Sequence, residues 1–320
     1  PFPENDAWWG KGFTEWTNTS KALPLFFGHY QPRLPGELGF YDTRLKEVMK
    51  RQIDLAKSHG IYGFCLYHYW FQGKPLMRVP YEQIITNEDI DIPFCLCWAN
   101  EPWTARFDGL STLGDVLIPQ VHTPEDDVAF FMDIKEALKD RRYIRVEGKP
   151  LLIIYRPGLF PDIKKTVALW RDLAKKEDIG ELFLVNVQNT FDRIIDPRTM
   201  DFDASIEFPP QNIPLDDIKS QIKLFDPDFQ GNIYEYSELV KKSLERKKPE
   251  YILFRGICPG WDCTPRRMNP VIFIGSDPDE YQTWLEGILK YSNDSLDINH
   301  SLVFINAWNE WAEGAYLEPD

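Results

Sequence analysis

The chain has 320 residues, of which 14% are aromatic, and its 36 Lys and Arg against 50 Asp and Glu give a formal charge of −14. This charge repels polyanions, so nucleic acid is not expected as a partner. No stretch is long enough to span a membrane and none resembles a signal peptide. The compartment is not predicted: the protein is expected in the cytoplasm, or in the periplasm or outside the cell if a signal upstream of Pro1 has been removed.

Residues 1–40 are rich in Pro, Gly and aromatic side chains and show no periodicity. Long irregular segments in compact domains usually serve function. We interpret this segment as a loop that forms one wall of a site, with His29 and Tyr30 as candidates for binding a sugar. The alternative is a hydrophobic arm that packs on the rest of the fold.

Beyond this segment, helical and strand-like patterns alternate along the chain. The apolar spacing in 42–58 predicts an amphipathic helix that Gly60 ends, and Thr123 with Pro124 predicts the start of another. Further helices are expected through Val167, Trp170 and Leu173 to an end near Gly180, near 236–246, and from 278. Buried strands are expected at 61–67, 92–98, 151–155, 182–187, 203–208, 251–257 and 302–305.

Strands that alternate with helices predict parallel βαβ units, which form either a closed barrel or a doubly wound sheet. Polar residues follow most of the strands, and a (β/α)8 TIM-type barrel brings all of these ends to one face. We therefore expect a single barrel domain over 1–320. Because only seven strands are found, we expect the first strand and the last helix to lie outside the chain. The polar strand-end residues are His68, Asn100, Glu101, Arg156, Gln188, Glu207, Trp261, Asp262, Asn309 and Glu310.

The last strand leads into a segment with two acids among indoles, Glu310 and Glu313 beside Trp308 and Trp311. Desolvation and mutual repulsion raise the pKa of at least one of two such neighbouring carboxyls. Glycosidic-bond cleavage usually requires one carboxyl that acts as an acid and a second that acts as a base. The alternative is a solvated loop after an edge strand.

Other candidates lie at the ends of the first two strands. Glu101 is expected to bind sugar hydroxyls while Arg106 holds it ionised, or else to form a structural ion pair. No His or Cys spacing indicates a metal site, and no glycine-rich phosphate loop or other cofactor motif is present. Whether Cys258 and Cys263 pair stays open, as does the oligomeric state. The remaining candidates for sugar binding are Tyr67, His68, Trp70, Trp98, Asn100 and Trp103.

Five stretches resemble the glycoside hydrolase family 99-like group, whose bacterial members are often labelled WbsX-type glycosyltransferases or lipopolysaccharide biosynthesis proteins. They are PENDAWWGKGFTEWTN at 3–18, GHYQP at 28–32, YGF with YHYW at 62–70, WANEPW at 98–103 and WNEWAEG at 308–314. The resemblance implies a (β/α)8 barrel that acts on α-linked sugars.

By position, the resemblance implies that Glu313 is the acid that protonates the departing oxygen and later the base that activates water. Glu310 would take the proton of the sugar 2-hydroxyl, so that a 1,2-anhydro sugar forms and the configuration is retained, and Asn309 would orient the sugar. Ala312 stands where the mannosidases of the family carry His. Ordinary two-carboxylate schemes remain open beside this one.

Three functions are compatible with these patterns. The first is a retaining glycoside hydrolase acting on an α-linked oligo- or polysaccharide. The second is a glycosyltransferase in the assembly of surface polysaccharide, and the third is a barrel that binds carbohydrate without catalysis. Paired acids explain bond cleavage directly, so the hydrolase is preferred. Sugar identity, linkage and endo or exo action are not predicted.

Overall fold

The computed structural model describes residues 2–104, 116–295 and 300–320. Within them, seven strands form a parallel sheet in which each strand lies beside its neighbour in the sequence. All seven strands expected from the sequence are therefore confirmed. They are β1 (Phe64–Phe71), β3 (Phe94–Trp98), β7 (Lys149–Ile154), β8 (Phe183–Gln188), β9 (Ala204–Glu207), β11 (Ile252–Ile257) and β13 (Val303–Ile305).

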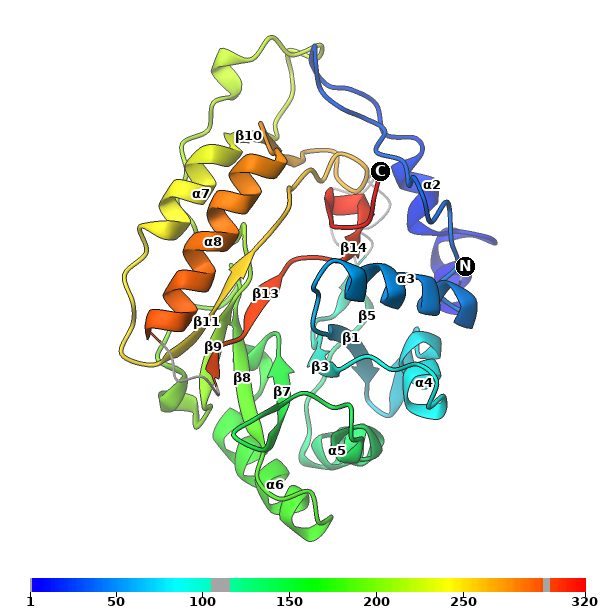
Figure 1. The fold of residues 1–320 in the computed structure, drawn as a ribbon. Helices are drawn as coiled ribbons and strands as arrows, with labels where there is room; N and C mark the ends of the chain where they lie inside the picture. Colours follow the sequence, from blue (N-terminus) through cyan, green and yellow to red (C-terminus); the bar gives the residue numbers. More distant parts are fainter. Residues whose placement is uncertain (1, 105–115, 296–299) are drawn as a thin grey trace.

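The sheet curls into part of a barrel (Figure 1). Its order is β13-β11-β9-β8-β7-β3-β1-β2, and the described residues contain no pairing between β1 and β13. The short strand β2 (Lys74–Leu76) runs antiparallel to β1, and β6 (Arg145–Val146) runs antiparallel to β7. The mixed α/β fold is thus confirmed, whereas a closed (β/α)8 barrel is not seen in the described part of the chain.

Helices surround the outer side of this curled sheet (Figure 1). The helix α5 starts as its sequence predicts, because the Thr123 hydroxyl accepts the backbone N–H of Asp126 at 3.2 Å. Helix α3 is followed by Gly60 at φ +79°, a conformation that favours glycine. The helices are α3 (Lys46–Ser58), α4 (Val79–Thr86), α5 (Pro124–Lys139), α6 (Ile163–Lys176), α7 (Tyr236–Leu244) and α8 (Pro278–Ser295). No helix in the described ranges has the length and apolarity that a membrane crossing needs.

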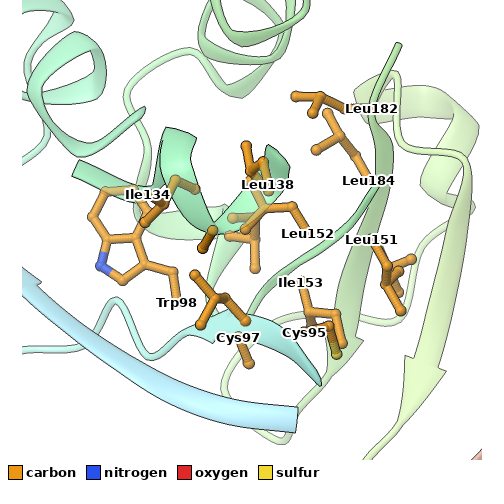
Figure 2. Close-up of a cluster of buried hydrophobic side chains, with 14 of the residues drawn as sticks. Cys95, Cys97, Trp98, Ile134, Leu138, Leu151, Leu152, Ile153, Leu182 and Leu184 are labelled. Atoms are coloured by element: carbon orange, nitrogen blue, oxygen red, sulfur yellow. The ribbon is translucent and has the colours of Figure 1, made fainter. Parts of the chain in front are cut away.

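The main core lies between the sheet and these helices. Figure 2 shows Ile134 and Leu138 of α5 beside Leu152 of β7, and all three are fully buried. Trp98 at the end of β3 stacks on Phe130 of α5, with ring centroids 3.8 Å apart. This packing holds α5 against the sheet and so keeps the strand ends in place.

The aromatic segment 1–40 is not only loop, which corrects the expectation from the sequence. It contains the short helices α1 (Pro3–Trp9) and α2 (Glu15–Thr19). The shorter pieces that were not predicted include helix α4, the strands β2 and β6, and three strand pairs near the strand ends. The pairs are β4 (Trp103–Thr104) with β5 (Val116–Ile118), β10 (Asn232–Glu235) with β12 (Val271–Ile274), and β14 (Asn309–Glu310) with β15 (Ala315–Tyr316).

The five cysteines are all free thiols. The pairing of Cys258 with Cys263, which the sequence left open, is therefore not formed. Burial raises the pKa of the Cys258 thiol, so it behaves as a small apolar side chain.

Candidate active site

A cavity of about 950 Å³ lies where the chain leaves the strands of the sheet. Its walls come from residues after β3, β7, β8, β9, β11 and β13, and from the N-terminal segment. The carboxyl ends of parallel strands that follow one another around a curled sheet meet at one face. The cavity is referred to below as the cleft, and Glu310 and Glu313 line it.

The two acids bind one buried arginine, Arg266. Its Nη1 donates to Glu313 Oε1 at 2.7 Å, and its Nη2 donates to Glu310 Oε1 at 2.7 Å. A third carboxylate, Glu15 Oε2, accepts from the same Nη2 at 2.7 Å. Charge-assisted bonds of this length fix the acids side by side in the cleft.

The charges around Arg266 do not balance, because three carboxylates share one guanidinium. Burial raises the pKa of Glu310 to about 8; Arg266 lowers it, and the negative charges of Glu313 and Glu15 raise it further. The direction of this shift favours a proton on the acid pair. The raised pKa of Glu310 agrees with the expectation that desolvation and repulsion raise the pKa of at least one carboxyl of the pair.

A tight turn places the two acids. Glu310 ends β14, and Trp311–Glu313 form a single 3₁₀ turn, η6, before Gly314 at φ +62°. The backbone N–H of Asp262 donates to the carbonyl of Glu313 at 2.6 Å. A Cβ at residue 314 would come within 2.9 Å of the Asp262 backbone nitrogen. Glycine is thus required at 314 by both conformation and space.

Side chains around this turn hold it to α2, where Trp16 contacts Trp311, and to α3, where Gln52 donates to Glu318. Trp311 is buried, stacks on Tyr316 with centroids 3.8 Å apart, and donates its indole N–H to Glu318 at 2.8 Å. The Tyr41 hydroxyl donates to the same carboxylate at 2.6 Å and accepts from Asn309 at 3.2 Å. Asn309 is exposed on the cleft wall.

The cleft lining contains a further acid, Glu101. Arg156 donates to Glu101 at 3.0 Å and to Asp192 at 3.4 Å, and its guanidinium lies 4.6 Å from the centre of the Phe191 ring. Burial raises the pKa of Glu101, and Arg156 lowers it. The cation of Glu101 in the described residues is therefore Arg156. Arg106, which the sequence proposed for this role, lies outside the described residues.

Asn100 is fully buried. Its amide accepts the backbone N–H of Arg156 at 2.7 Å and donates to the backbone carbonyl of Arg156 at 2.8 Å. Asn100 thus fixes the arginine that faces Glu101, and it is not part of the cleft lining.

Aromatic side chains supply the remaining walls. Trp103 packs against Trp9 and Tyr69, with ring centroids 6.1 and 5.6 Å away. Tyr67, which is 42% exposed, faces Tyr155 at 6.2 Å. Rings that line a cleft in this way suit the apolar faces of sugar rings. Of the sugar-binding candidates proposed from the sequence, those in the cleft lining are Tyr67, Glu101, Trp103, Asn309 and Trp311.

His29 and Tyr30 line a separate, smaller pocket of about 480 Å³. Leu25 donates its backbone N–H to His29 Nδ1 at 3.0 Å, so Nε2 is the donor to Asp262 Oδ2 at 2.8 Å. Gln31 and Thr264 also donate to Asp262, at 2.7 and 2.6 Å. Burial acts to raise the pKa of Asp262, but these bonds, with His29 first, hold it below its ordinary value. The cluster anchors the N-terminal segment behind the active-site turn.

Four other candidates from the sequence point away from the cleft. His68 lies 3.2 Å from Asp133, and Trp70 donates to Asp126 at 2.9 Å, so both side chains face α5. Trp98 is fully buried in the core. Trp308 packs on Phe64 with ring centroids 5.5 Å apart and is not part of the lining.

Two residues at the centre of the site were not among the candidates. Arg266 comes from the loop after β11, and Glu15 starts helix α2. One signal for Arg266 was available, since two neighbouring acids that are partly buried favour a cation between them. No group of three or more His, Cys, Asp or Glu in the described ranges could hold a metal ion.

Comparisons with known proteins cover the whole chain. The family described as "Glycosyltransferase WbsX" matches residues 1–320. Proteins named WxcX from two strains of Xanthomonas campestris pv. campestris are 46% identical over 321 residues, and the match covers 100% of this chain. The chain spans about half the length of these curated relatives, 46% in each case.

Solved structures also resemble this fold. A glycoside hydrolase-like protein has a TM-score of 0.58 at 14% identity and covers 96% of this chain and 92% of its own. A GH99 endo-alpha-mannosidase from Bacteroides thetaiotaomicron has a TM-score of 0.54 at 15% identity, covering 89% and 78%. At these identities the likeness establishes a shared fold.

Proposed function

Because the chain belongs to the WbsX family, described as glycosyltransferases, we propose that it is a carbohydrate-active enzyme, and specifically a retaining glycoside hydrolase acting on α-linked glycans. The observation that carries this proposal is the pair Glu310 and Glu313, held side by side on Arg266 in an aromatic cleft. The glycoside hydrolase fold of the structural neighbours supports it.

The proposed reaction uses one proton on the pair of acids. Glu310 takes the proton of the sugar 2-hydroxyl, whose oxygen attacks the anomeric carbon, while Glu313 gives its proton to the departing oxygen. In the second step Glu313 takes a proton from water, the water oxygen opens the 1,2-anhydro ring, and Glu310 returns its proton to the 2-hydroxyl. The pair then again carries one proton.

The raised pKa of Glu310, about 8, favours a proton on this pair in the free site. Both acids bind the same guanidinium, so a sugar hydroxyl approaching Glu310 favours transfer of the proton to Glu313. Two carboxyls coupled this closely lose their protons as a pair. The reaction requires that the pair holds one proton, whichever oxygen carries it in the free protein.

The test is a panel of defined α-linked oligosaccharides incubated with the protein, with the product anomers followed by NMR. The proposal expects release of sugar with the starting anomer formed first. A second candidate, a glycosyltransferase, is favoured by the description of the family. It predicts no hydrolysis, and sugar transfer only when a nucleotide sugar is added. Binding to glycans without turnover under either condition would contradict both.

A pH dependence follows from the raised pKa of Glu310. A carboxyl with a pKa of about 8 keeps its proton up to that pH and loses it above. We therefore expect kcat/KM to fall tenfold per pH unit above about 8, because the pair then carries no proton for the leaving group. A kcat/KM that stays flat or rises between pH 8 and 10 would contradict the shared proton.

A further inference from the structure

The N-terminal segment contributes a charged side chain to the site, Glu15. Its Oε2 and the Oε1 of Glu310 lie at the same distance, 2.7 Å, from one nitrogen of Arg266. The two carboxylate oxygens are thus no more than two hydrogen-bond lengths apart. Like charges this close repel each other strongly in a partly buried site.

Packing holds Glu15 in this position. It is the first residue of α2, and the next residue, Trp16, lies with its ring 5.5 Å from that of Trp311 in the active-site turn. The Trp16 indole also donates to the backbone carbonyl of Tyr41 at 3.0 Å. Helix α2 is therefore fastened to the same turn that carries Glu310 and Glu313.

Glu310 faces charged or titratable groups from four elements. They are Arg266 from the loop after β11, Glu313 from η6, Glu15 from α2 and Tyr69 from β1. Burial raises the pKa of Tyr69 far above neutrality, and the surrounding carboxylates keep Arg266 charged. Burial raises the pKa of Glu310 as well, and Glu15 binds the guanidinium nitrogen that Glu310 also binds.

We propose that Glu15 is a positioning residue of the acid pair, which shares Arg266 with Glu310 and thereby keeps one proton on Glu310 and Glu313. This inference rests on the proposed function of the pair. Without the charge of Glu15, the guanidinium acts more fully on Glu310, which then ionises at lower pH. Glu15 lies on the cleft wall with 40% of its side chain exposed, so it can serve in this role before a substrate arrives.

The experiment compares Glu15→Gln, Glu15→Asp and the unchanged protein in their pH profiles of kcat/KM. The alkaline limb should move about one pH unit lower in Glu15→Gln, and stay in place in Glu15→Asp, which keeps the charge. A purely structural role would lower Tm in Glu15→Gln without moving this limb, and that result would overturn the inference. Glu37→Gln, an exposed change outside the cleft, is the control.

A second measurement separates this inference from the function itself. The carboxyl titration of Glu310 is followed by infrared difference spectra, assigned through Glu310→Gln, and needs no substrate. A lower midpoint in Glu15→Gln supports the inference even when no glycan is cleaved, in which case the hydrolase proposal alone fails. An unchanged midpoint overturns the role of Glu15, whether or not the protein is active.

Discussion

Replacing Glu313 by Gln is expected to lower kcat on a susceptible glycan by roughly 10²–10⁴-fold, the usual contribution of a positioned acid or base. The amide has nearly the shape of the carboxyl, and it can still accept a bond from Arg266, but it cannot supply a proton to the departing oxygen. The loss should therefore appear in kcat more than in KM. The measurement is steady-state kinetics on the glycan found by the panel, with Tm recorded for both proteins.

The matched control is Glu37→Gln, which removes one carboxylate from an exposed position outside the cleft. Its kinetics should be unchanged. An activated substrate offers a further check, because a leaving group that needs no proton should restore the first step in Glu313→Gln. Unchanged turnover of an ordinary glycan by Glu313→Gln would remove the mechanism proposed here.

Much of the fold could be predicted from the sequence because its strands are continuous apolar runs. Strands that are buried on both faces of a parallel sheet are continuous apolar runs without a polar alternation. Short apolar runs such as 151–155 and 182–187 therefore predict buried strands. The helices α1 and α2 could not be predicted in the same way. Their residues show no apolar periodicity, and α2 is held by tertiary contacts of Trp16 with Trp311 and Tyr41.

The alternation of side chains along a strand explains which candidates reached the cleft. In β1 successive residues point to opposite faces, so Tyr67 and Tyr69 line the cleft while His68 and Trp70 face α5. Proximity to the strand end alone predicted Tyr67, His68 and Trp70 together as candidates. The alternation of side chains along a strand separates Tyr67 and Tyr69, on the cleft face, from His68 and Trp70, on the face toward α5.

The centre of the site depends on contacts between distant parts of the chain. Arg266 lies 44 residues from Glu310 and 251 residues from Glu15 in the sequence. The loop that carries it follows β11 without a pattern of its own. Its position is set by the fold, through Asp262, which bonds to both His29 and the backbone of Glu313. No local sequence pattern therefore predicts that Arg266, Glu310 and Glu15 meet.

Replacing Arg266 by Met should destabilise the protein and stop turnover, because three carboxylates would lose their shared cation. Removing one partner from a buried ionic cluster costs about 3–5 kcal/mol. The cost depends on pH with a definite sign. Without the guanidinium the pKa values of these carboxyls rise above those of the unfolded chain, so their contribution to stability is lost as pH increases. The fall in Tm should therefore be larger at pH 8 than at pH 5.

Thermal unfolding of Arg266→Met at the two pH values checks this prediction. Arg51→Met, an exposed change whose guanidinium bonds only to the carbonyl of Glu37 in the described residues, is the control. The double variant Arg266→Met with Glu15→Gln should regain part of the stability at pH 8, since one uncompensated charge is removed. An equal fall in Tm at pH 5 and pH 8 would mean that Arg266 stabilises the site by packing alone, and that its charge does not hold the acids together.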